Sequence, residues 1–298
     1  MEETARFVDI DKNLGVSMCK ISIIVVCLNP GNKLIETMES IRSQSFQDYE
    51  VVVKDGFSKD GSIDGLKNWL QDSGTVMADR VHIHQLQDKS IYEAMNQACG
   101  LAEGEYFYFL NCGDHFYQKD SLERMAAEMD KHPSGRLFYG NVYDALRESV
   151  VQSNPKMDAF ACYRNVPCHQ ACIYHRSLFA EHGYKPEYRV RADYEHFLWC
   201  FFEKKIKPVY VPVALALYEG GGFSETEASR IRSKEEHSEI VATYMSKGQI
   251  FKYKLILALT LQPVRTAMAE SKVFGRLYQS AKKMLYKMKS CGKKDVRR

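Results

Sequence analysis

The chain has 298 residues, of which 45% are hydrophobic, enough for a sizeable core in one large or two modest domains. Its net charge of +3 excludes the strongly basic character typical of proteins that bind nucleic acid. We expect neither a secretory signal peptide nor a membrane-spanning helix, because the first 20 residues lack an apolar core and no segment reaches about 18 consecutive apolar residues. The nine cysteines form no CxxC pair, which favours buried free thiols in a reducing, cytoplasmic compartment.

The first part of the chain alternates between buried strands and amphipathic helices. After an N-terminal extension over residues 1–20, continuous β-branched runs predict strands buried on both faces, and apolar residues three and four apart predict helices. The predicted strands are residues 21–27, 49–55, 81–86 and 105–111, and the predicted helices are 34–43, 63–70 and 90–102. This alternation predicts an α/β fold with a Rossmann-like, mostly parallel central sheet flanked by helices.

Polar residues gather where these predicted strands end. The four strands are followed, in order, by Asn29, Asp55, Asp88 and Asp114. Parallel strands end at one edge of a sheet, and ligands of open α/β sheets bind there, so we expect these side chains to share a site. The turn after the second strand, DGFSKDGS, is neither a GxxxxGK[ST] phosphate loop nor a GxGxxG fingerprint, which argues against ATP hydrolysis and dinucleotide oxidation.

From about residue 135 the pattern changes to a mixed or antiparallel region. Its predicted elements are strands at 136–145, 148–153 and 170–175, a helix at 193–205 and a pair of strands within 208–218. We interpret residues 21–224 as one domain with halves at about 21–114 and 115–224. From about residue 225 the chain becomes helical and charged.

The last part of the chain is strongly basic. Residues 247–298 hold 14 basic and 2 acidic side chains, whereas the residues before them hold 27 basic and 36 acidic ones. Apolar residues recur there at helical spacing among the lysines, a pattern typical of a helix lying on an anionic membrane surface. A helix packed on the domain with a solvated basic end is the alternative.

Three aspartates are candidates for chemistry, and two of them have a structural alternative. Asp114, after Gly113, is suited to hold a divalent cation on a diphosphate, or else caps the following helix. Asp55 stands where its carboxylate can accept hydrogen bonds from a base or ribose. Asp193 precedes an apolar helical stretch, so spacing favours an N-cap, and a general base for an acceptor hydroxyl is the alternative.

The segment CHQACIYH contains four residues with metal-ligand chemistry, but its spacing fits no usual zinc pattern. His169 and Gln170 within it are candidates to line an acceptor cleft. A buried, hydrogen-bonded histidine is an equally good interpretation.

The ordered set of motifs resembles the family 2 glycosyltransferases with the GT-A fold, in the branch used for bacterial capsule, exopolysaccharide and lipopolysaccharide assembly. The matching segments are ISIIVVCLN, VVVKDGFSKDGS, DKSIYEAMNQACGLAEGEYFYFLNCGD, PCHQACIYHRSLF and RADYEHFLW. The resemblance covers roughly residues 21–224, with a nucleotide-binding half first, an acceptor half second, and a C-terminal helical basic tail over 225–298. It implies an inverting, metal-dependent transfer of a sugar from a UDP- or GDP-sugar to a saccharide or lipid-linked saccharide, on the inner face of the cell membrane.

The resemblance also implies roles for individual residues. Nucleotide-sugar contacts are expected from Asn29, Asp55, Asp88, Lys89, Gly113 and Asp114, and acceptor contacts from His169, Gln170 and Arg191. Asp114 would hold Mn²⁺ or Mg²⁺ as the last carboxylate of the family's DxD motif, and Asp193 would be the catalytic base. The DxD position reads Cys112-Gly113-Asp114, so only one carboxylate remains.

Two other functions share some of these features. A GT-A-like nucleotidyltransferase would use the same sheet and metal aspartate but has no use for a base at Asp193. A non-catalytic, membrane-associated binding protein would not need Asp55, Asp114 and Asp193 together.

Overall fold

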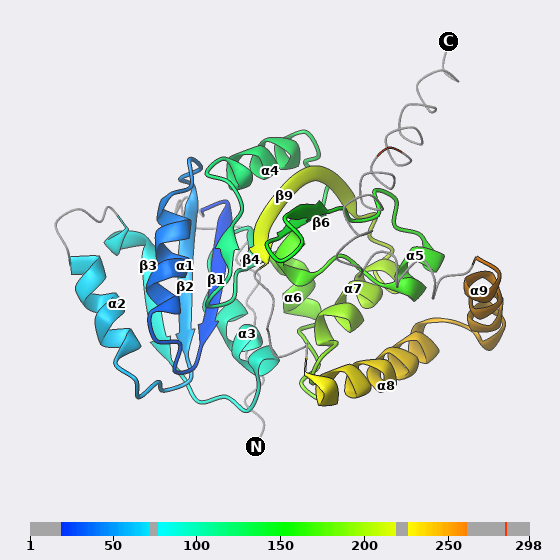
Figure 1. Cartoon of the computed structure of the whole chain (residues 1–298). Coiled ribbons are helices and arrows are strands. Elements are labelled where there is room, and N and C mark those ends of the chain that lie inside the picture. The colour runs from blue at the N-terminus through cyan, green and yellow to red at the C-terminus, as the bar shows by residue number, and fades with distance from the viewer. Residues whose placement is uncertain (1–18, 72–76, 219–225, 261–283, 285–298) are drawn as a thin grey trace, which may run out of the picture.

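A computed structural model describes residues 19–71, 77–218, 226–260 and 284 (Figure 1). The strands are β1 Ile21–Cys27, β2 Tyr49–Asp55, β3 Val81–Gln85, β4 Tyr106–Phe109, β5 His115–Phe116, β6 Leu137–Asp144, β7 Ser149–Val151, β8 Cys172–His175 and β9 Val209–Tyr218. The helices are α1 Lys33–Arg42, α2 Ser62–Gln71, α3 Ile91–Cys99, α4 Ser121–Asp130, α5 Ala159–Arg164, α6 Arg176–Glu181, α7 Ala192–Phe202, α8 Glu227–Tyr244 and α9 Lys247–Leu259, with short 3-10 turns η1 Ala78–Arg80 and η2 His169–Ala171.

One mixed sheet forms the centre of the molecule, with the spatial order β3-β2-β1-β4-β8-β6-β9-β5. β1 pairs in parallel with both β2 and β4, and β2 pairs in parallel with β3. The predicted α/β fold and parallel first half are therefore confirmed. Because the chain leaves β1 toward β2 on one side and returns to β4 on the other, the strand order reverses between β1 and β4, where open α/β sheets bind ligands.

Successive residues of β1 supply the cores on the two faces of the sheet. Ile23 and Val25 are fully buried with Leu34 of α1, in the cluster that also includes residues of α2 and α4. Ile24 faces the other way, into the cluster that contains residues of α3, α6 and α7. This double burial explains why apolar β-branched residues predominate in the strand without polar alternation.

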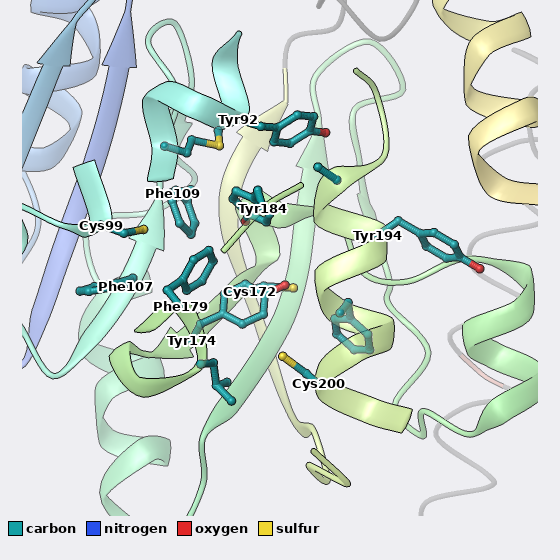
Figure 2. Packing of buried hydrophobic residues seen from close by; sticks show 14 of the residues in the cluster. Tyr92, Cys99, Phe107, Phe109, Cys172, Tyr174, Phe179, Tyr184, Tyr194 and Cys200 are labelled. Carbon is teal, nitrogen blue, oxygen red and sulfur yellow. The ribbon is translucent and has the colours of Figure 1, made fainter. Parts of the chain in front are cut away.

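The second of these clusters is unusually aromatic and connects α3 to the elements around α7 (Figure 2). Phe179 of α6 lies with its ring centroid 5.2 Å from that of Phe109 and 5.0 Å from that of Tyr184. Tyr184 in turn meets Tyr92 of α3 edge-on at 5.3 Å. Such ring pairs add about 0.5–1.5 kcal/mol each beyond area burial, so α3 is firmly placed against the second half of the domain.

The second half of the chain differs from the prediction at residues 208–218. They form one long strand, β9, and not a pair. Pro212 lacks a backbone donor and is unfavourable inside a sheet. Pro212 lies in a stretch where the β6–β9 register shifts, between the pairs Tyr139↔Tyr210 and Asn141↔Ala214, so the strand accommodates proline at an irregularity.

The C-terminal part is helical, as predicted, through α8 and α9. None of the described helices is long and apolar enough to cross a membrane. Residues 219–225, 261–283 and 285–298, which include most of the strongly basic stretch 247–298, lie outside the described residues.

Candidate active site

The turns that follow β1 and β2 are tied to each other at the carboxyl edge of the sheet. The backbone N–H of Asn29 donates to Ser58 Oγ at 2.7 Å, and the Lys59 N–H donates to Asn29 Oδ1 at 2.8 Å. Asn29 has a left-handed backbone with φ +48°, a conformation that asparagine tolerates better than most residues. Asn29 therefore shapes this edge by joining its two loops.

Asp55 lies beneath this edge and is completely buried. Its carboxylate accepts hydrogen bonds from the Ser58 N–H and from Gln85 Nε2, both at 2.9 Å. Three exposed apolar side chains surround the same strand ends: Leu28, Phe57 and Leu86. The structure thus places Asp55 beneath a surface that exposes these three apolar side chains among polar ones.

Asp88 forms an ion pair with Lys54, whose side chain is completely buried in β2. A Cβ atom on Gly56 would lie 3.0 Å from Asp88 Oδ2, so a larger residue would crowd this pair where it passes under the turn. Lys89 is exposed, and its N–H donates to the Glu93 carboxylate at 2.8 Å as α3 begins. Both predicted residues thus lie at the same edge as Asp55.

Asp114 follows a tight turn that is fastened to α1. Gly113 has φ +96°, its N–H donates to Thr37 Oγ1 at 2.9 Å, and Thr37 Oγ1 donates to the Asp114 carbonyl at 3.0 Å. The next element is the strand β5, so the alternative that Asp114 caps a helix is wrong. Lys33 lies over the turn, with Cδ 3.3 Å from where a Cβ on Gly113 would be.

Two adjacent residues of η2 connect Asp114 with Asp193. Gln170 Nε2 donates to Asp114 Oδ2 at 3.0 Å. The neighbouring His169 places Nδ1 3.6 Å from Asp193 Oδ2, and Asn111 Nδ2 lies 2.9 Å from Nε2 on the other side of the ring. One short turn therefore joins the two carboxylates for which the sequence predicted chemistry.

Asp193 is the second residue of α7, and not its N-cap. Arg191 occupies the cap position without a side-chain cap bond, so the N-cap interpretation is wrong. Asp193 Oδ1 accepts from the Tyr194 N–H at 2.8 Å, and the Tyr92 hydroxyl lies 3.3 Å away. Burial opposes ionisation of the Asp193 carboxyl, but His169 and the Tyr194 N–H outweigh it and hold the pKa below the usual value. Asp193 is consequently an ionised acceptor of protons at neutral pH.

The other charged residues of this segment have structural contacts. Arg191 donates from Nε to Ser233 Oγ at 2.7 Å and from a terminal nitrogen to Asn165 Oδ1 at 3.3 Å. Glu195, two residues after Asp193, is 1% exposed and pairs with His182 at 2.9 Å and with Lys185 at 2.8 Å. Of the two helix carboxylates, Asp193 faces the site and Glu195 is enclosed by its partners.

A cavity of about 260 Å³ lies beside η2 on the side of the second half. Its wall combines the β6–β7 hairpin, α5 and the loop before η2, including Val151, Asn154, Met157, Arg164, Asn165 and Cys168. The described residues that line it include an arginine and no carboxylate. The volume is close to the lower end of small-molecule sites, roughly 300 Å³.

Comparison with known proteins identifies the family. The model of the family "Glycosyl transferase family 2" matches residues 22–181, more than half of the chain. A PGL/p-HBAD biosynthesis glycosyltransferase from Mycobacterium bovis is 35% identical over 207 residues, covering 69% of this chain and 79% of that protein. The chain belongs to glycosyl transferase family 2.

Solved structures of similar fold include glycosyltransferases with bound donors. Staphylococcus aureus TarS residues 1–349, in complex with UDP-GlcNAc, matches with a TM-score of 0.60 at 19% identity, over 86% of this chain and 74% of that one. The mannosyltransferase PcManGT from Pyrobaculum calidifontis, in complex with GDP-Man and Mn²⁺, matches with a TM-score of 0.57 at 15% identity, over 93% and 89%. These likenesses show the GT-A fold, as the sequence predicted.

The family 2 glycosyltransferase site contains partners that the sequence did not reveal. Tyr92 contacts Asp193, Asn111 contacts His169, and Lys33 lies over Gly113, yet all three occupy ordinary helical or strand-end positions in the sequence. Gln170 contacts Asp114 directly, although we had expected it on the acceptor side. Gln170 and Asp114 come together only because η2 packs against the end of β4 in the folded chain.

The described residues contain no group of three or more His, Cys, Asp or Glu placed to hold a metal ion. Mg²⁺ and related cations nevertheless bind through one or two carboxylates when phosphates and water complete the shell. Asp114, at the strand-order reversal and beside Lys33, fits such a partial set. A divalent ion is therefore compatible with these residues when a diphosphate supplies further oxygens.

Proposed function

We propose that this family 2 glycosyltransferase transfers a sugar, with inversion, from a UDP- or GDP-sugar to a hydroxyl of a saccharide or lipid-linked saccharide in cell-surface polysaccharide biosynthesis. The observation that carries the proposal is the pair His169–Gln170, whose adjacent side chains contact Asp193 and Asp114. In this proposal a proton acceptor and a diphosphate-side carboxylate are held by two adjacent residues of one short turn. Inverting transfer needs this arrangement, because the acceptor attacks the anomeric carbon from the side opposite the departing diphosphate.

Asp193 is the general base in this proposal. Its ionised carboxylate takes the proton of the acceptor hydroxyl while the acceptor oxygen bonds to the anomeric carbon. The bond from that carbon to the diphosphate oxygen breaks, and its electron pair leaves with the nucleoside diphosphate. Tyr92 and His169 support the base by orienting its two oxygens, and burial keeps the Tyr92 pKa well above its usual value, so that the phenol remains a donor.

Asp114 would hold Mn²⁺ or Mg²⁺, which when bound neutralises charge on the diphosphate. Gln170 orients the carboxylate by donating to Oδ2. Lys33, which lies over Gly113, is placed to add a second positive charge beside the same phosphates. The positive charge of Lys33 would supply part of the phosphate charge neutralisation that a metal ion held by a full DxD motif provides.

The donor and acceptor would occupy different sides of η2. The exposed Leu28, Phe57 and Leu86 offer an apolar face for a nucleobase at the edge supported by Asp55. The 260 Å³ cavity on the other side of η2, with Arg164 and Asn165 in its wall, offers polar contacts for the acceptor.

We further propose that the C-terminal part contacts an anionic membrane on its cytoplasmic face. In α9 the side chains of Phe251, Leu255 and Leu259, each four residues apart, are 70%, 50% and 73% exposed. The helix also has three lysines and no acidic residue. An apolar stripe with basic neighbours suits binding to anionic lipid.

Point variants test the membrane proposal without disturbing the core side of α9. Phe251→Ser with Leu255→Ser should reduce cosedimentation with phosphatidylserine-containing vesicles. Ile231→Ser is the matched control, because Ile231 is 56% exposed on α8. Equal binding by both proteins would contradict the assignment of this stripe.

The donor site is tested by calorimetric titration with UDP, GDP, CMP and dTDP, with and without Mn²⁺. One nucleoside diphosphate should bind selectively, and Mn²⁺ should strengthen its binding by roughly tenfold or more. Asp114→Asn should abolish the Mn²⁺ effect. Absence of binding to every nucleotide would contradict the proposed function and favour a non-catalytic binding protein.

A further inference from the structure

A carboxylate from α8 binds the backbone that leads into α7. Glu236 is 2% exposed, and it accepts from three consecutive N–H groups: Arg189 at 2.8 Å, Val190 at 3.0 Å and Arg191 at 2.9 Å. Arg232, one turn earlier on α8, donates to the same carboxylate at 2.9 Å. Helices α7 and α8 lie side by side, so this clamp ties α8 to the backbone that leads into α7 (Figure 1).

The clamped segment carries the proposed base. α7 begins at Ala192, one residue after the last clamped N–H, and Asp193 is its second residue. Val190 is held on both sides of its backbone, because its N–H donates to Glu236 and its carbonyl accepts from Tyr92 at 2.9 Å. The same Tyr92 hydroxyl lies 3.3 Å from Asp193 Oδ1. Glu236, Val190, Tyr92 and Asp193 therefore form one connected set of contacts.

The clamp depends on a carboxylate and not on a side chain of similar shape. Three N–H groups and a guanidinium together need four acceptor positions, and an ionised carboxylate has about four lone-pair sites on two oxygens. Glutamine has one carbonyl oxygen and would turn an NH₂ group toward an N–H donor. Leaving buried donors unsatisfied costs about 1–3 kcal/mol per group, so the segment would move to find other partners.

We propose that Glu236 is a positioning residue for Asp193: it fixes the backbone before α7 so that the base meets His169 and Tyr92. The inference rests on the proposed role of Asp193. A misplacement of about 1 Å at a reacting group lowers the rate on the order of 100-fold. The donor should still bind, because the contacts of Glu236 within the described part of the chain are the N–H groups of residues 189–191 and Arg232, which lie outside the ends of β1, β2 and β4.

The test compares Glu236→Gln with Glu235→Gln, which removes the same charge from the neighbouring, exposed position of α8. Donor hydrolysis is measured with the nucleotide-sugar selected in the calorimetric panel, and amide hydrogen exchange is measured at residues 189–191. Glu236→Gln should lower kcat about 10- to 100-fold with little change in KM, and should accelerate exchange at these amides. Glu235→Gln should resemble the wild type in both measurements.

Four results separate failure of this inference from failure of the proposed function. Wild-type kcat in Glu236→Gln, with Asp193→Asn inactive, would overturn the role of Glu236 and leave the base intact. Unchanged exchange at residues 189–191 would overturn the clamp itself. If Glu236→Gln does not fold, Glu236→Asp keeps the charge on a shorter stem and should fold with a partial loss of kcat, and wild-type kcat in that variant would also overturn the inference. An inactive wild-type enzyme would contradict the proposed function. The exchange measurement at residues 189–191 needs no enzyme activity, so it would still test the clamp.

Discussion

Glu195→Gln tests whether the second carboxylate of α7 is a stability element and not a catalyst. Glu195 is 1% exposed, pairs with His182 and Lys185, and accepts from the Tyr244 hydroxyl at 2.5 Å. Burial alone would raise its pKa, but His182, Lys185 and Tyr244 lower it from 4.5 to about 2. At about 1.4 kcal/mol per pKa unit, the ionised form contributes about 3 kcal/mol to folding at neutral pH.

Removing one partner of a buried ion pair changes the unfolding free energy by an amount similar to that derived from the Glu195 pKa. Such losses cost about 3–5 kcal/mol, and the lower end applies here because the Lys185 side chain is 35% exposed and can be rehydrated. The folded-state pKa is depressed, so the contribution is fully present above about pH 4.5 and is lost as the pH falls toward 2. At pH 3 about half of it should remain.

The assay is urea denaturation of the wild type and Glu195→Gln at pH 7, 5, 4 and 3. The difference in unfolding free energy should be about 3 kcal/mol at pH 7 and should shrink by about half at pH 3. Glu203→Gln, at an exposed position at the end of the same helix, should show little difference. A difference below about 1 kcal/mol at pH 7, or one that does not change with pH, would refute the reasoning.

Three further variants test other parts of the account. Lys33→Met should weaken nucleoside diphosphate binding roughly tenfold in calorimetry without a comparable effect on a nucleoside monophosphate, and equal effects on both would argue against a phosphate contact. Phe57→Gly should weaken nucleotide binding yet raise the unfolding free energy by up to about 1 kcal/mol, because Phe57 has a left-handed φ of +64°; a loss of stability would contradict the strain argument. Phe179→Ala should lower the unfolding free energy by about 3–5 kcal/mol, measured by denaturation, and a change below 1 kcal/mol would contradict its central place in the aromatic core.

The sequence predicted the elements whose signals are local. β1 and β2 have the predicted bounds, because a run of β-branched residues buried on both faces has few other solutions. The polar residues after these strands also share one edge, because parallel strands align their ends. The single strand β9 was missed, because the accommodation of Pro212 depends on the register with β6, which no local pattern contains.

The candidate site was predicted in its carboxylates but not in its connections. Asp114 and Asp193 stand at recognisable motif positions, whereas the turn that joins them is built from His169 and Gln170 only after β4 and β8 pair. Glu236 is separated from Asp193 by more than 40 residues of sequence and stands in a charged helix among similar glutamates. Nothing in its neighbours distinguishes it until α8 packs on α7.

The most direct test of the account is product analysis with the selected nucleotide-sugar, comparing the wild type with Asp193→Asn. An inverting transfer with Asp193 as its base should release a nucleoside diphosphate and give a product of inverted anomeric configuration. The rate should be about 10²- to 10⁴-fold lower in Asp193→Asn, with unchanged donor affinity. Release of pyrophosphate would indicate a nucleotidyltransferase. A fully active Asp193→Asn enzyme, or a product of retained configuration, would contradict the assignment of Asp193 as the base of an inverting transfer.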